Sequence, residues 1–240
     1  MRMPLLLIAA AVLPLGACHF SASAETGPVV QRAYPVTGPF TGLAVAGRYD
    51  VKVISGQAVS VAASGHEKAL DAMVVEVRNG TLTIHPIRQN GFHFGWEHHG
   101  KVEVTVTVPA IDSAEIAGSG AINVDHVAGA SFKGTVAGSG DLTLPAVDAQ
   151  ALDLSIAGSG DIHAVGKAQS VKLNIAGSGD IDTSKLNVLD AEASIAGSGG
   201  IKGHATRNAA ISIMGSGDVE INGGAKCTVS KTGSGDARCS

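Results

Sequence analysis

Apolar residues occupy every second position on both sides of a Gly-Ser-Gly triplet that recurs through the second half of the chain. Around the first triplet they are Ala114 and Ile116 before it and Ile122 after it. This is the periodicity of a β-strand, because successive side chains of a strand point to opposite faces. The triplets begin at Gly118, Gly138, Gly158, Gly177, Gly197, Gly215 and Gly233. Each repeat is therefore predicted to be a strand, a sharp glycine corner, a second strand and a variable return segment.

The steps between triplets are 20, 20, 19, 20, 18 and 18 residues, which is the near-constant period of a repeat architecture. Stacked in register, such units form continuous parallel sheets that bury their apolar columns against one another. The prediction is an all-β fold, a parallel β-helix or β-solenoid of stacked coils with Gly-Ser-Gly corners. A β-propeller is the alternative, but its blades usually need about 40 residues or more.

The first half of the chain is less regular but also rich in strands. Residues 59–63, 74–78, 81–85 and 102–108 alternate as strands, and residues 66–73 are predicted to form one helical turn. Asn79-Gly80 indicates a hairpin turn. Residues 47–50 stand in the place of a triplet and its following residue. One solenoid domain is predicted over residues 36–240, with irregular coils over 36–110 and regular repeats over 111–240.

The N-terminus has the pattern of an export signal. Residues 1–18 place one arginine before a short apolar stretch that ends in Leu-Gly-Ala-Cys, as in a lipoprotein signal. Lipidation of Cys18 is predicted, and His19 after it favours the outer membrane, on its periplasmic or cell-surface side. Cleavage after Ala24 is the alternative and would leave a soluble periplasmic protein. Residues 19–35 are small, polar or proline-containing and are predicted to be a flexible tether.

Charge and cysteine content narrow the classes of function. The chain has 17 basic and 21 acidic residues and no basic patch, which argues against a nucleic-acid partner. Cys227 and Cys239 lie six residues before and six after the first glycine of the last triplet, both at inward-facing positions. In an oxidising compartment they are predicted to form a disulfide that closes the last coil. No catalytic motif or phosphate-binding loop is present, so neither an enzyme nor a cofactor is predicted.

The segment from 86 to 100 is the candidate partner-binding loop. It holds Phe92, His93, Phe94, Trp96, His98 and His99. Loops on a rigid scaffold often carry binding, and exposed aromatic rings suit a glycan, an envelope protein or a membrane surface. Two alternatives remain open: the rings cover an open end of the core, or the histidines with Glu97 hold a transition metal.

An aspartate follows five of the seven triplets, and the series is broken by Ala121 and Gly200. The five are Asp141, Asp161, Asp180, Asp218 and Asp236. In register their carboxylates would repel one another. The column is therefore predicted to bond corner N–H groups, with bound cations as the alternative.

Residues 102–113 read V-E-V-T-V-T-V-P-A-I-D-S and precede repeated Ala-Gly-Ser-Gly-Asp units. This pattern resembles the head (GIN) domain of putative auto-transporter adhesins, a family of bacterial envelope proteins. The resemblance implies a β-helical fold and an envelope location. The expected function is a non-enzymatic binding or structural module, an adhesin-like head tied to the membrane by its lipid. The alternatives are a self-assembling structural element and a carbohydrate-active β-helix enzyme.

Overall fold

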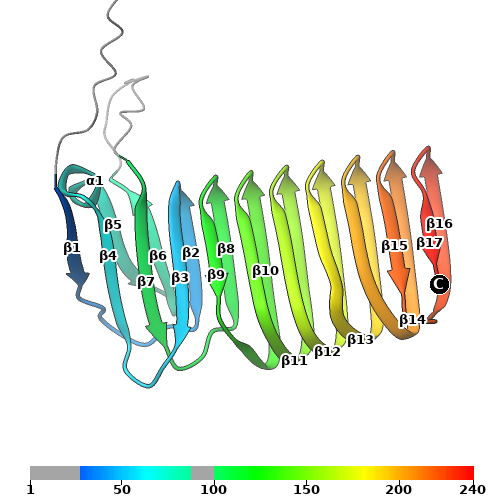
Figure 1. Cartoon of the computed structure of the whole chain (residues 1–240), viewed down its shortest axis with the longest axis horizontal. Coiled ribbons are helices and arrows are strands. Elements are labelled where there is room, and N and C mark those ends of the chain that lie inside the picture. The colour runs from blue at the N-terminus through cyan, green and yellow to red at the C-terminus, as the bar shows by residue number, and fades with distance from the viewer. Residues whose placement is uncertain (1–27, 88–99) are drawn as a thin grey trace, which may run out of the picture.

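The computed structural model describes residues 28–87 and 100–240, and nearly all of them belong to one continuous β-sheet that coils about a long axis. Figure 1 shows the coils stacked in a row, with β1 and α1 at one end and β16 and β17 at the other. The predicted all-β solenoid is confirmed.

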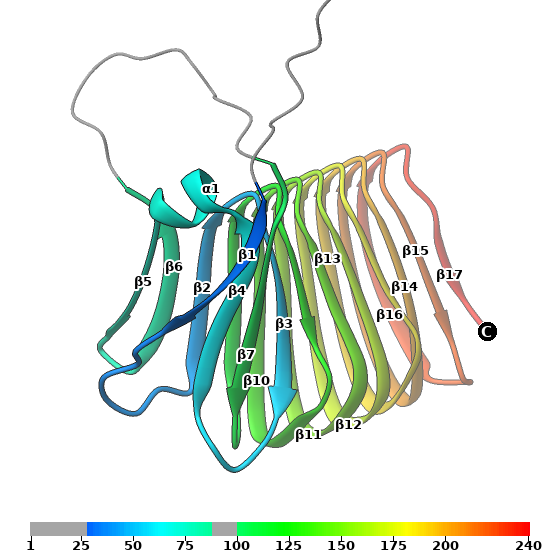
Figure 2. The same ribbon diagram turned by 60° about the vertical axis from the view of Figure 1, so that its left-hand side comes forward.

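The regular coils are built from long parallel strands that run from one triplet to the next. They are β8 (Ser113–Gly118), β9 (Ala121–Val124), β10 (Val127–Gly138), β11 (Asp141–Gly158), β12 (Asp161–Gly177), β13 (Asp180–Gly197), β14 (Gly200–Gly215), β15 (Asp218–Asn222), β16 (Lys226–Gly233) and β17 (Ala237–Cys239). β11, β12 and β13 each bend within one unbroken strand and each pair with the coil on either side. Figure 2 shows the successive bends lying one behind another.

The triplets form a ladder along one edge of the solenoid. Register pairs the first glycine of each triplet with the first glycine of the next, from Gly118 to Gly233. Gly47 joins the ladder by pairing with Gly118, so the predicted degenerate unit at residues 47–50 is confirmed.

Glycine is required in this ladder for two separate reasons, which Gly158 illustrates. Its φ is +140°, a conformation that side-chain-bearing residues rarely adopt. A Cβ there would also overlap the carbonyl oxygen of Gly138 in the preceding coil. That oxygen already accepts the N–H of Ser159 at 2.8 Å, so it has little freedom to move.

Aliphatic columns fill the space between the faces of each coil. The column two residues before the triplets runs Ile116, Val136, Ile156, Ile175, Ile195 and Ile213, all buried. Removal of this apolar surface from water supplies the main stabilisation, about 25 cal/mol per Å². Thr183 is the buried polar side chain of the described core, and its hydroxyl donates to the carbonyl oxygen of Lys202 at 2.9 Å.

The N-terminal part adds antiparallel strands to the first coils. Its elements are β1 (Val29–Tyr34), β2 (Gly42–Gly47), β3 (Tyr49–Ser55), β4 (Ser60–His66), α1 (Glu67–Asp71), β5 (Met73–Arg78), β6 (Thr81–Pro86) and β7 (Val102–Val108). The predicted strands, helical turn and hairpin are all confirmed, and Asn79 and Gly80 both have positive φ. However, β4 runs antiparallel to β7 and β5 antiparallel to β6, so residues 36–110 are not coils throughout.

The tether predicted for residues 19–35 is wrong over Val29–Tyr34, which forms β1 and pairs antiparallel with β4. Alternate residues of β1 are half-buried, and two of them fix the strand to the helix. Tyr34 donates its hydroxyl to the carbonyl oxygen of Leu70 at 3.1 Å, and Arg32 pairs with Asp71 at 2.8 Å. These contacts order a segment whose small and polar composition indicated a linker.

A disulfide closes the last coil of the sheet. The predicted disulfide between Cys227 and Cys239 is present, across a sequence separation of 12 residues. Cys227 continues the buried column of Ala191 and Ala209, so the bond ties the interior of the terminal coil together. Two inward columns further along β16, Lys231 stands where the preceding coil has Ile213.

Candidate functional site

Two of the predicted sites lie outside the described residues. These are the lipidation site Cys18 and the loop residues Phe92, His93, Phe94, Trp96, His98 and His99. Both stay predictions. Within the described ranges, no helix is long and apolar enough to cross a membrane.

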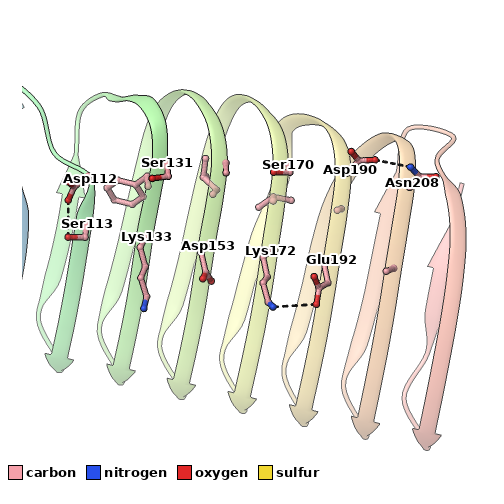
Figure 3. Close-up of a pocket in the computed structure, with 16 residues that line it drawn as sticks. Asp112, Ser113, Ser131, Lys133, Asp153, Ser170, Lys172, Asp190, Glu192 and Asn208 are labelled. Atoms are coloured by element: carbon pink, nitrogen blue, oxygen red, sulfur yellow. Dashed lines mark hydrogen bonds and ion pairs between the residues drawn. The ribbon is translucent and has the colours of Figure 1, made fainter.

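An open groove of about 750 Å³ crosses consecutive coils on the described surface. We call it the coil-face groove. Its polar lining is drawn in Figure 3, where the side chains come from the same position of successive strands. The lining includes Asp112, Ser113, Ser131, Lys133, Ala151, Asp153, Ser170, Lys172, Asp190, Glu192, Asn208 and Ala210. Because six coils contribute, the groove extends for about 24 Å along the axis, at about 4.8 Å per coil.

One wall of the groove is a row of alternating charge. Register places Lys133 beside Asp153, Asp153 beside Lys172 and Lys172 beside Glu192. Opposite charges on neighbouring strands stabilise the pairing, whereas like charges would destabilise it. The Lys172 ammonium lies 3.5 Å from the Glu192 carboxylate, and this contact is visible in Figure 3. The row is thus consistent with the register of the coils and presents both signs of charge to the groove.

The other wall carries short polar side chains at the bend of the coils, chiefly Ser131, Ser170, Asp190 and Asn208. Asp190 is the most constrained of them. It accepts hydrogen bonds from the guanidinium of Arg207 and, at 2.9 Å, from the side-chain amide of Asn208. The Arg207 hydrogen bonds, and then that of Asn208, lower the pKa of Asp190 to about 2. This wall therefore holds a permanently ionised carboxylate among hydroxyl and amide groups.

The floor of the groove is apolar. It is formed by the column between the two walls, Phe132, Leu152, Val171 and Ala191, whose side chains are buried and point into the coil. A ligand in the groove would therefore contact mainly the polar and charged side chains of the two walls.

The charged row has a signal in the sequence that a search for catalytic motifs does not detect. Lys133, Asp153, Lys172 and Glu192 each stand five residues before the first glycine of a triplet. Considered alone, the lysines of the repeats look scattered. Considered at constant offset, two of them alternate with acids, and this signal predicts a shared column on one face.

A second, smaller hollow of about 440 Å³ lies beside the aspartate column, near the C-terminal end. Three aspartates accept backbone N–H groups of the next coil there. The N–H of Asp180 donates to Asp161 at 3.1 Å, that of Gly200 to Asp180 at 2.7 Å, and that of Asp236 to Asp218 at 2.8 Å. These bonds are the predicted corner contacts. In residues 28–87 and 100–240 no group of three or more His, Cys, Asp or Glu side chains is arranged to hold a metal ion.

Glycoside hydrolysis would need two carboxyl groups with distinct roles, one of them a protonated acid with a raised pKa. The pKa of Asp190 is lowered instead, and Lys172 and Glu192 engage each other. Asp190 therefore does not fit the role of the protonated acid.

The model of one protein family, described as "Putative auto-transporter adhesin, head GIN domain", matches residues 39–225. No curated protein sequence matches the chain. Several solved structures share its fold. A protein described as a putative adhesin from Bacteroides fragilis has a TM-score of 0.80 at 20% identity, covering 89% of this chain and 97% of that one.

Two further structures extend this comparison. A protein described as a putative lipid binding protein from Parabacteroides distasonis has a TM-score of 0.72 at 23% identity, covering 90% of this chain and 98% of its own. A protein described as a putative adhesin from Parabacteroides merdae has a TM-score of 0.74 at 17% identity, covering 90% and 97%. At such identities the likeness establishes the shared fold.

Proposed function

Because the chain belongs to the family of head GIN domains of putative auto-transporter adhesins, we propose that it is a non-enzymatic, adhesin-like binding module of the bacterial envelope. Membership indicates an extracellular or envelope location. The proposal goes further and assigns binding to the coil-face groove.

One observation carries this assignment: the groove displays charged, hydroxyl and amide groups at a fixed spacing on strands that cannot move independently. β11, β12 and β13 are hydrogen-bonded to neighbours on both sides, so their outward side chains are held in register. Binding to a preorganised surface loses less conformational freedom, which favours affinity. An open rather than enclosed groove also suits a large ligand on another surface.

The structural relatives described as putative adhesins support adhesion, and one relative is described as a putative lipid binding protein. Lipid binding finds less support in this chain, because the groove walls are charged and its apolar floor side chains are buried. Self-assembly through the terminal coil is the other rival. It is disfavoured by Lys231, whose charge stands in an otherwise aliphatic column.

We further propose that Cys18 carries the lipid that holds the module at the outer membrane. The full chain, expressed in a Gram-negative host with an alkyne fatty acid, should incorporate the label. The Cys18→Ser variant should not, and it should leave the membrane fraction. Equal labelling of both proteins would show that the anchor is elsewhere.

The groove assignment is tested by filling the groove. Ala151 lines it from β11, so Ala151→Arg places a long side chain between the two walls. Cosedimentation of the purified protein with outer-membrane and cell-wall fractions should show binding by the native chain. The variant should bind about 10-fold more weakly, equivalent to about 1.4 kcal/mol.

Ala157→Arg is the matched control. Ala157 is exposed on the same strand and lies outside the groove, so the variant adds the same charge without filling the hollow. It should bind like the native chain. Equal binding by Ala151→Arg would remove the groove from the proposal, and no binding by the native chain to any fraction would reject a binding module.

A further inference from the structure

Building on the proposed function, we infer that the coil-face groove binds a glycan strand without net negative charge, laid along the solenoid axis across the strands. The inference follows from the length of the groove, the pairing of its strands and the balance of its charges.

The length and direction of the groove favour a chain molecule. Side chains from six consecutive coils line it, so equivalent groups repeat about every 4.8 Å over about 24 Å. A compact metabolite would contact only two or three of these coils. A linear polymer lying along the axis meets a polar or charged side chain at nearly every step, and its affinity grows with each unit added.

The pairing of the strands argues against a peptide. Extended peptides usually bind by adding a strand to a free sheet edge, where backbone groups give the affinity. Within the described coils, β10 to β13 are hydrogen-bonded on both sides, so the groove offers no free backbone edge. Recognition must use side chains, and those of the bend wall are hydroxyls, an amide and a carboxylate. These are the partners that sugar hydroxyl groups require.

The charges select against polyanions. Four carboxylates line the groove, Asp112, Asp153, Asp190 and Glu192, against the two ammonium groups of Lys133 and Lys172. With the Arg207 guanidinium that pairs with Asp190 from beside the groove, one negative charge remains in excess. An acidic polysaccharide or a phosphorylated glycan would therefore meet a surface of its own sign. A neutral glycan instead uses both signs, because its hydroxyl groups donate to carboxylates and accept from lysines.

The experiment measures binding of defined oligosaccharides to the purified protein by isothermal titration calorimetry. The probes are chitohexaose and cellohexaose, their disaccharides, and the acidic hexamer of galacturonic acid. At least one neutral hexasaccharide should bind, its disaccharide should bind about 10-fold more weakly or worse, and the acidic hexamer should bind least. Affinity for the neutral probe should change little between about 0.05 M and about 0.5 M salt, because charge pairing is not its source.

Variants locate the site. Ala151→Arg should abolish binding of the neutral hexasaccharide, and Ala157→Arg should preserve it. Lys133→Ala should weaken binding, whereas Lys167→Ala should not, because Lys167 pairs with Asp148 outside the groove. Preference for the acidic hexamer, or failure of both neutral hexamers to bind, would overturn the glycan assignment. If the envelope cosedimentation still responded to Ala151→Arg, the groove would remain a binding site for another ligand.

Discussion

Gly158→Ala is expected to destabilise the domain by about 4 kcal/mol, because a methyl group would meet both backbone strain and a backbone atom. The positive φ of Gly158 is unfavourable for alanine, and the new Cβ would overlap the carbonyl oxygen of Gly138. That oxygen accepts one of the hydrogen bonds that hold adjacent coils together. If it moved to relieve the overlap, its hydrogen bond from the N–H of Ser159 would break. Chemical denaturation of the purified variant measures the loss.

Gly129→Ala separates the two causes. Gly129 has a φ of +130°, close to that of Gly158, but a Cβ there would meet nothing within 4 Å. This control should lose only the conformational term, about 1 to 2 kcal/mol. Similar losses in both variants would mean that the close approach of neighbouring triplets contributes nothing to the glycine requirement.

Loss of the disulfide is the second large effect. Replacing Cys227 and Cys239 together by alanine should cost about 3 kcal/mol, the loop-entropy value for a closure of this length. In a stacked array each coil contacts its neighbours only, so the damage should concentrate in β16 and β17. Hydrogen exchange should accelerate in residues 226–239 and change little around Gly158.

Reduction of the disulfide in the native chain provides the control for the double cysteine variant. Dithiothreitol should accelerate exchange of the native chain in the same segment and leave the double variant unaffected. A double variant with native exchange rates in residues 226–239 would show that stacking alone secures the terminal coil.

The regular half of the fold could be predicted because one local pattern repeats. Ile116 and Ile122 flank Gly118, and apolar residues flank the later triplets at the same offsets. Equivalent residues at a near-constant period indicate coils that are stacked in register. The disulfide was predictable for the same reason, since both cysteines fall at inward-facing offsets. In these positions local preference and tertiary packing favour the same conformation.

The strand β1 and the coil-face groove could not be predicted, because they depend on contacts that no local pattern specifies. Val29–Tyr34 has the composition of a linker, and it becomes a strand because β4 and α1 supply partners for it. The groove was not predicted, because it forms where the coils bend between two columns of outward-facing side chains. An offset such as that of Lys133 and Asp153 reveals a column, but not whether the column borders a hollow.

Lys231 has a consequence for how the protein behaves at high concentration. A parallel solenoid is a template for its own extension, since β16 pairs with β14 alone among the described strands and leaves its other edge for a chain of similar spacing. An added layer would bury the ammonium of Lys231 against aliphatic side chains, at a large desolvation cost. We therefore expect this one charge in the terminal coil to oppose the addition of further layers, in a repetitive, alanine- and glycine-rich sequence that could otherwise propagate as a fibril.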